Sequence, residues 1–129
     1  MAARQRIGSG SPYEARVGFS RAVRVGPHVA VAGTAPIWLD GTVNPDPLVQ
    51  AQRCWKIALA ALEQVGGTTA DVVRTRTYLT DASSEEAAAQ AHAERFGEVQ
   101  PASTMLVVAA LLDPRWLVEV ELDAYLEST

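Results

Sequence analysis

The sequence has almost no cysteine and no long apolar run. Cys54 is the only cysteine, which excludes an internal disulfide and favours a reducing compartment. No stretch of 18 apolar residues is present, and the first residues lack the apolar core of a secretory signal. We therefore expect a cytoplasmic protein without a membrane partner.

Positive charge is also scarce. The chain has 11 Lys and Arg against 15 Asp and Glu, a net charge of −4, and Lys56 is its single lysine. The cations are scattered and form no basic patch, which disfavours a nucleic-acid partner. Two histidines, His28 and His92, and the absence of C-x-x-C, H-x-x-x-H and Gly-rich phosphate-binding motifs predict neither a metal nor a cofactor.

Length and composition indicate one globular domain. With 129 residues, 48% hydrophobic and 20% charged, the chain is long enough to bury a core without metal or disulfide. We expect a single domain over residues 1–129. Residues 1–12 should be a loose N-terminal segment, because this stretch is basic and then rich in Gly and Ser.

Two helices are predicted. Asp46 followed by Pro47 is a strong helix start, and apolar residues at helical spacing continue to Gly66. Ser83 with Glu86 has the spacing of a capping box, which predicts a second, alanine-rich helix to about Phe96.

Strand patterns occupy the rest of the chain: a hairpin over 13–34 that turns at 26–28, then 71–79, 104–111 and 116–125. The run 104–111 is almost wholly apolar, as in strands covered on both faces. The order ββ–α–β–α–ββ predicts an α+β fold with both helices on one sheet face. No helix is left for the other, largely apolar face, so we expect chains to associate through their sheets.

The last predicted strand carries three acids on one face, Glu119, Glu121 and Asp123. A solvated outer face is the commoner environment for such residues. The alternative is that one of them points into a partly dry pocket, where its pKa would rise enough for it to carry protons. The alternation alone does not decide between these environments.

Three segments together resemble the Rid family (reactive intermediate deaminases, also called YjgF-like or L-PSP-like). Residues 18–34, GFSRAVRVGPHVAVAGT, are similar to the family's opening P-Y-S-Q-A-V … S-G-Q hairpin. Leu62 to Gly66 and DVVRTRTYLTD at 71–81 are similar to L-x-x-x-G … D-V-V-K-T-x-V-Y-L-x-D. Pro101-Ala-Ser and Val118-Glu-Val-Glu121 are similar to the closing P-A-R and I-E-I-E segments.

This resemblance, over residues 18–125, implies a fold like that of the small chorismate mutases. It implies a homotrimer around a central β-barrel, with helices outside and a small-molecule ligand cleft at each subunit boundary. The family reaction adds water to the C=N bond of a 2-imino acid and releases ammonium and a 2-keto acid.

Several family site residues are replaced in this chain. The family arginine that binds the substrate carboxylate falls on Ser103, the hairpin tyrosine on Phe19, and the serine before the hairpin glycine on Ala32. Gly33 and Glu119, which match the family's backbone donor and water-positioning glutamate, remain. Loss of the arginine removes charge-assisted hydrogen bonds worth ~1.5–3 kcal/mol each. Arg21 and Arg76 are candidate substitute cations; the default for each is a surface arginine.

We therefore expect a divergent Rid-like homotrimer with Glu119 as acid/base, while the sequence leaves open whether it is an enzyme. The expected substrate contacts come from Phe19, Arg21, Gly33, Ser103, Met105 and Trp116. If the protein is an enzyme, we expect a hydrolase or deaminase that acts on a reactive imine, enamine or related electrophile, and not an archetypal 2-imino acid deaminase. The alternative is a non-catalytic metabolite-binding or regulatory trimer that keeps the cleft as a ligand pocket.

Overall fold

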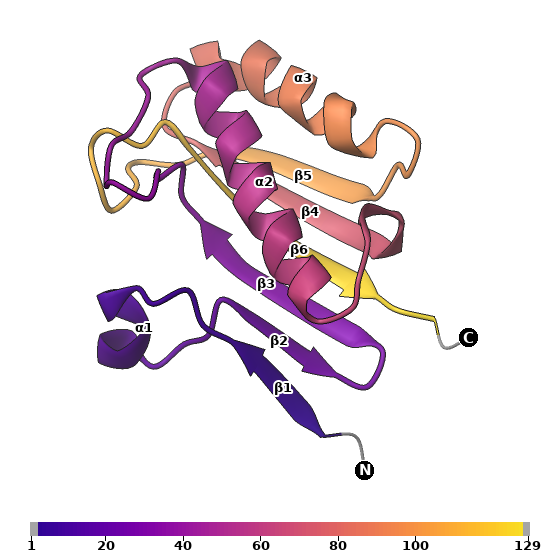
Figure 1. The fold of residues 1–129 in the computed structure, drawn as a ribbon. Coiled ribbons are helices and arrows are strands. Elements are labelled where there is room, and N and C mark those ends of the chain that lie inside the picture. Colours follow the sequence, from indigo (N-terminus) through magenta and orange to yellow (C-terminus); the bar gives the residue numbers. More distant parts are fainter. Residues whose placement is uncertain (1–2, 128–129) are drawn as a thin grey trace.

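The computed structural model describes residues 3–127, which form one mixed sheet with two long helices on one face (Figure 1). The elements in chain order are β1 Arg4–Ile7, α1 Pro12–Val17, β2 Ala22–Val25, β3 His28–Thr34, α2 Pro47–Gln64, η1 Thr69–Asp71, β4 Val72–Leu79, η2 Ala82–Ser84, α3 Glu85–Phe96, β5 Ala102–Val107 and β6 Val118–Tyr125. The six strands lie in the order β1-β2-β3-β6-β4-β5. β4 and β5 are parallel, and the other neighbours are antiparallel.

The predicted start of α2 is confirmed. Asp46 is its N-cap, and the carboxylate accepts hydrogen bonds from the backbone N–H groups of Leu48 and Val49 at 2.8 and 3.3 Å. Pro47 occupies the first helical position, where its missing N–H costs nothing.

The predicted capping box of α3 is wrong. The Asp81 carboxylate accepts a hydrogen bond from the Ser83 N–H and begins the short helix η2, and Ser84, the N-cap of α3, makes no side-chain cap bond. Because η2 leads directly into α3, its backbone takes over the role expected of the Ser83 and Glu86 side chains.

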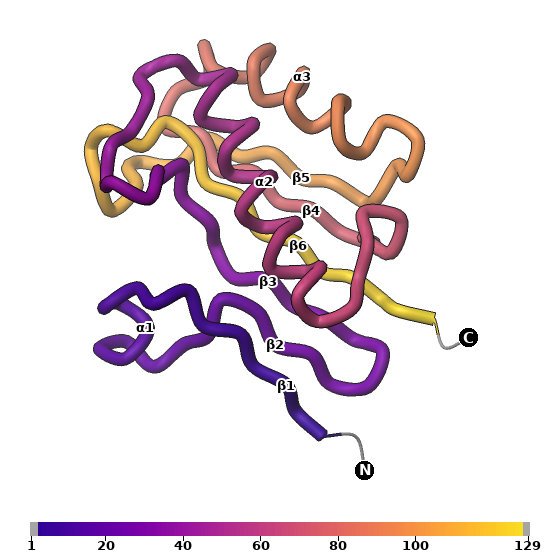
Figure 2. The backbone as a smooth tube through the Cα atoms, in the orientation of Figure 1, coloured from indigo at the N-terminus to yellow at the C-terminus, as the bar shows by residue number. Residues whose placement is uncertain are grey.

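The core lies between the sheet and the layer formed by α2 and α3. Trp55 and Leu62 of α2 and Phe96 of α3 are fully buried against Val120 and Leu122 of β6. Figure 2 follows the chain from β4 through α3 into β5, the crossover that makes these two strands parallel. No helix within residues 3–127 is long and apolar enough to cross a bilayer.

The N-terminal region is more ordered than expected. Within the segment predicted to be loose, Arg4–Ile7 forms β1, which pairs with β2 at the sheet edge; Met1 and Ala2 lie outside the described residues. The polar and charged side chains of β1 show no apolar alternation, so the sequence pattern does not predict a strand here. Charged residues are nevertheless common on edge strands.

The predicted hairpin is shorter than expected at its N-terminal end. Residues 13–17, predicted as strand, belong to α1, which Ser11 caps by accepting a hydrogen bond from the Tyr13 N–H. Gly18, with φ of 93°, ends this helix in the left-handed conformation. The hairpin proper is formed by β2 and β3 around Gly26 and Pro27.

The apolar strand β5 is an edge strand of this chain and is not covered on both faces. It ends at Val107 rather than at residue 111, and Leu106 and Val107 are about half exposed. Only Met105 packs against the core from this strand.

The sheet face opposite the helices is called the open face below. The predicted alternation of β6 is confirmed: Val118, Val120, Leu122 and Ala124 are buried, whereas Glu119, Glu121 and Asp123 are only partly buried on the open face. Exposed apolar side chains, among them Val25, Val73, Leu106 and Tyr125, accompany the acids. The open face is therefore a mixture of carboxylates and uncovered apolar surface.

Candidate functional site

Glu119 lies on the open face near the start of β6, between β3 and β4. It is paired with Tyr78 of β4 in the strand register. On the other side its carboxylate lies against Gly33, so closely that a Cβ atom at residue 33 would overlap Glu119 Oε2. The absence of a side chain at Gly33 is therefore what leaves room for this carboxylate.

Arg21 holds the segment of β3 that contains Gly33. Its Nη1 donates hydrogen bonds to the carbonyl oxygens of Ala32 and Gly33 at 3.1 and 2.9 Å and to the Thr34 hydroxyl at 2.6 Å. The β3–β6 register shifts between Val31 and Thr34, so these groups belong to a β-bulge. Arg21 thus fixes the bulge against which Glu119 packs.

Burial raises the pKa of Glu119 above its usual range; the positive charge of Arg21 opposes this rise, and Glu121 adds to it. Burial likewise lowers the pKa of Arg21, which the carboxylates of Glu14 and Glu119 oppose. Arg21 stays charged because its pKa starts far above neutrality. The pair is a carboxyl group that can gain a proton beside a cation that cannot lose one.

The other two acids of β6 have polar partners. Tyr78 Oη donates a hydrogen bond to Glu121 Oε1 at 2.6 Å, and Arg76 Nη1 lies 3.5 Å from carboxylate oxygens of both Glu121 and Asp123. The hydrogen bond to Glu121 is the main cause that raises the pKa of Tyr78. Among the described residues Glu119 has no such side-chain partner, which singles it out from the three acids.

The sequence-predicted site residues fall into separate groups. Glu119, Gly33 and Arg21 come together on the open face, and Phe19, 37% exposed, lies two residues before Arg21 in the link from α1 to β2. Trp116 is buried just before β6, and its indole nitrogen has no hydrogen-bond partner within the described part of the chain.

Ser103 and Met105 lie on the opposite face of the sheet. They pair in register with the buried Thr75 and Thr77 of β4, on the helix side, whereas Glu119 pairs with Tyr78 on the open face. One chain therefore does not bring Ser103 and Glu119 into a common site. Tyr78, which sequence reasoning did not select, belongs to the surroundings of Glu119 because of the β4–β6 register.

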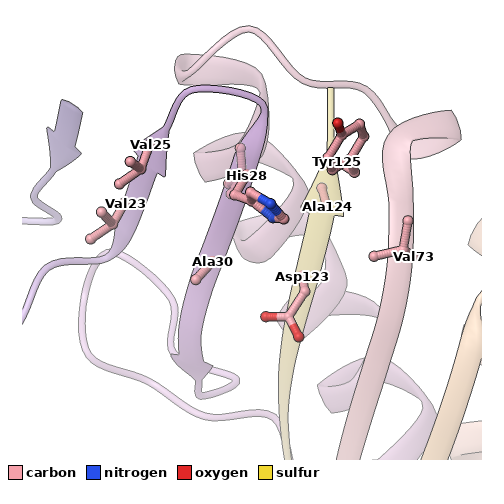
Figure 3. Close-up of a pocket in the computed structure, with 9 residues that line it drawn as sticks. Val23, Val25, His28, Ala30, Val73, Asp123, Ala124 and Tyr125 are labelled. Carbon is pink, nitrogen blue, oxygen red and sulfur yellow. The ribbon is translucent and has the colours of Figure 1, made fainter. Parts of the chain in front are cut away.

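An open groove lies at the far end of the open face. Figure 3 shows Asp123 and Tyr125 of β6, His28 and Ala30 of β3, Val23 and Val25 of β2 and Val73 of β4 around it. Its volume is about 490 Å3, and the rings of His28 and Tyr125 meet edge to face with centroids 5.1 Å apart. Glu119 does not line this groove, so the groove and the perturbed carboxyl group are separate.

No three His, Cys, Asp or Glu side chains of residues 3–127 gather closely enough to hold a metal ion. The buried Cys54 thiol contacts the Val118 carbonyl oxygen at 3.7 Å, and burial raises its pKa. A thiol held in its protonated form is a poor nucleophile and a poor metal ligand, so Cys54 has a packing role.

Comparison with known proteins identifies the family. Residues 10–126 match the family model described as "Endoribonuclease L-PSP". The chain belongs to the L-PSP (YjgF/Rid) family. A curated relative from Streptomyces coelicolor, an uncharacterized protein, is 40% identical over 122 residues, covering 94% of this chain and 91% of the relative. A RutC family protein from Pyrococcus abyssi is 34% identical over 112 residues, covering 84% and 87%.

Solved structures of the L-PSP (YjgF/Rid) family share this fold. A YjgF/YER057c/UK114 family member from Mycobacterium tuberculosis is 44% identical with a TM-score of 0.89, covering 96% of this chain and 100% of that one. A putative endoribonuclease from Thermotoga maritima is 25% identical with a TM-score of 0.82, covering 95% and 93%. The α+β fold expected from the sequence, a sheet with helices on one face, is confirmed.

Proposed function

We propose that this L-PSP family protein is a homotrimer that hydrolyses the C=N bond of a small imine or related electrophile, with Glu119 as the acid/base. Membership of the family supports a role connected with small molecules. The observation that carries the finer proposal is the state of Glu119: a half-buried carboxyl group with a raised pKa, packed against Gly33 and within the electrostatic influence of the Arg21 cation. A carboxyl group whose pKa is raised in this way is a candidate general acid/base.

The chemistry needs only one carboxyl group and water. With the imine nitrogen protonated, the Glu119 carboxylate takes a proton from a water molecule as the water oxygen bonds to the imine carbon. The C=N π electrons move to nitrogen, which gives the neutral carbinolamine. The protonated Glu119 then gives that proton to the amine nitrogen of the carbinolamine. Loss of ammonia, with transfer of the remaining hydroxyl proton, leaves the carbonyl product.

Assembly through the open face is supported by the separation of the expected site residues. Ser103 and Met105 lie at the sheet edge on the helix side, so a cleft that also contains Glu119 requires a second subunit. The exposed Val25, Val73 and Tyr125 would be covered by such packing.

The substrate should differ from an amino-acid-derived imine. Arg21 Nη1 is already occupied by two carbonyl oxygens and a hydroxyl group, and Arg76 lies between Glu121 and Asp123. Both candidate substitute cations therefore have acceptors within the chain. The net charge of −4 also disfavours RNA binding, so the proposal does not include the ribonuclease activity of the family description.

The assembly is tested by light scattering. A trimer would have about three times the chain mass of 13.8 kDa. A monomer at micromolar concentration would refute the proposed intersubunit cleft.

The chemistry is tested by comparing Glu119→Gln with Asp123→Asn, which removes a carboxylate from the same face of the same strand. Imines with and without a carboxylate are generated in solution and their decay is followed. We expect Glu119→Gln to lose at least 10²-fold in turnover, as for a general acid–base group, while Asp123→Asn keeps it. Equal turnover by Glu119→Gln and the unmodified protein would remove Glu119 from the mechanism. Ligand binding without turnover would favour the metabolite-binding alternative.

A further inference from the structure

Ser103, Thr75 and His92 form a hydrogen-bonded cluster on the helix side of the sheet, away from Glu119. Thr75 Oγ1 lies 2.7 Å from His92 Nε2 and 2.9 Å from Ser103 Oγ, and Ser103 Oγ lies 3.5 Å from His92 Nε2. The cluster joins β4, α3 and β5. Its three polar atoms are within reach of one another, and Thr75 is the link.

The three residues of the cluster differ in their exposure to solvent. Thr75 is fully buried, His92 is partly buried against the rings of Trp55 and Phe96, and Ser103 is exposed at the sheet edge. Burial lowers the pKa of His92, so its imidazole is neutral at neutral pH. Only Ser103 can therefore present the cluster to a ligand.

A neutral imidazole lets the cluster act as a donor or as an acceptor. When Nε2 carries the ring proton, His92 donates to Thr75, Thr75 donates to Ser103, and the Ser103 hydroxyl proton is free to point outward. When Nε2 lacks it, Ser103 donates to Thr75, Thr75 donates to Nε2, and Ser103 offers its lone pairs outward. The exposed hydroxyl thus matches a carbonyl, amide or hydroxyl group, and brings no positive charge to a carboxylate.

We propose that Ser103, positioned by Thr75 and His92, is the specificity-determining anchor for a neutral polar group of the ligand, so that the protein prefers an uncharged amide to the matching carboxylate. This inference rests on the proposed function, because the ligand would reach from Ser103 of one subunit to Glu119 of another. It names the substrate class of that site: small electrophiles that carry a neutral amide, carbonyl or hydroxyl group where an amino-acid-derived imine carries its carboxylate.

The test measures binding without chemistry. Titration calorimetry on the Glu119→Gln protein compares 2-oxobutanamide with 2-oxobutanoate, which differ only in the amide or carboxylate group bonded to the keto carbon. We expect the amide to bind more tightly. Ser103→Ala should weaken amide binding roughly 2- to 12-fold, the net contribution of one hydrogen bond, and leave oxobutanoate binding unchanged. Ser103→Arg, which places a cation there, should reverse the preference.

Two threonines of the same strand separate positioning from general packing. Thr75→Val removes the link, and should weaken amide binding as Ser103→Ala does. Thr77 lies on the same buried face, and its hydroxyl has no hydrogen-bond partner among residues 3–127, so Thr77→Val should not weaken amide binding. Amide binding should also shift the 15N resonance of His92 Nε2 in the unmodified cluster and not in Thr75→Val. If Thr75→Val does not fold, the substitutions at the exposed Ser103 still test whether this residue binds the neutral group of the ligand.

Equal or tighter binding of 2-oxobutanoate, no binding of the amide, or a Ser103→Ala protein with unchanged amide affinity would each overturn this inference. Its failure is distinct from that of the proposed chemistry. Ser103-dependent binding together with Glu119-independent turnover would keep the anchor and reject the acid/base role. Glu119-dependent turnover with Ser103-independent binding would do the reverse.

Discussion

Gly33→Ala is the most specific perturbation of the candidate site. The added Cβ would overlap Glu119 Oε2, and because ordinary van der Waals contact begins at 3.4 Å, the oxygen has to move back by about 1 Å. The atom that must move is the free end of a flexible side chain, so the cost in folding free energy should be small, below about 1 kcal/mol. A displacement of this size in a catalytic group typically costs on the order of 10²-fold in rate.

Three measurements on Gly33→Ala follow from this geometry. Urea unfolding should give nearly the stability of the unmodified protein. Imine turnover should fall by on the order of 10²-fold. An NMR titration of the labelled Glu119 carboxyl carbon should show its pKa moving down towards the ordinary range, because the displaced carboxylate is less buried.

Gly67→Ala is the matched control for an added methyl group. Its Cβ would overlap the side chain of Leu62, which is fully buried in the core, and no atom of Glu119 is near it. We expect a clear loss of stability with unchanged turnover per folded molecule. If Gly33→Ala kept full turnover and an unaltered Glu119 titration, the close packing of these two residues would have no part in the chemistry.

Two further predictions concern stability. Thr77→Val should be neutral or stabilising by up to ~1 kcal/mol, because it removes a buried hydroxyl that has no partner in the described part of the chain. Thr75→Val breaks two hydrogen bonds and should cost about 1–3 kcal/mol in urea unfolding. Equal losses of stability for both variants would contradict these hydrogen-bond assignments. The raised pKa of Glu119 stabilises the folded unmodified protein below the unfolded pKa of about 4.3, and this contribution is lost as the pH rises through the folded pKa. Glu119→Gln has no such contribution to lose. Its stability should therefore rise relative to that of the unmodified protein between about pH 4 and pH 8. A stability difference that is the same at both pH values would show that Glu119 titrates alike in the folded and unfolded chains.

The parts of the fold that depend on interactions between residues near one another in the sequence were the most predictable. Asp46 and Pro47 start a helix through bonds that involve only the next three residues, so this start was predicted to the residue. The same logic applied to Ser11 and Pro12 would have predicted α1, but the valines and Phe19 that follow were interpreted as a strand. Arg4–Ile7 gave no signal, because an edge strand with polar side chains has no alternation to detect.

The candidate site was only partly predictable, because its geometry depends on cross-strand register. The alternation in β6 placed Glu119, Glu121 and Asp123 together. It did not reveal that Tyr78 and Arg76 contact Glu121, whereas Glu119 has no side-chain hydrogen bond or ion pair within residues 3–127. Those contacts depend on which residue of β4 faces which residue of β6, a long-range pairing that neither strand specifies by itself.

The same dependence on register explains why Ser103 and Glu119 were expected in one site although a single chain separates them. Within a strand, side chains alternate between faces, but the face that a given residue takes is fixed only once its strand has paired. β5 pairs in parallel with β4 after the α3 crossover, and this register places Ser103 beside Thr75 on the helix side while Glu119 lies beside Tyr78 on the open face. The family resemblance implies that Ser103 and Glu119 line one cleft of an assembly. In the sheet of a single chain they lie on opposite faces. The two residues can share a cleft only if the β5 edge of one subunit meets the open face of another. The effects of Ser103 and Glu119 substitutions on the binding of a ligand that spans both residues should then be coupled. In a monomer the two effects should be independent.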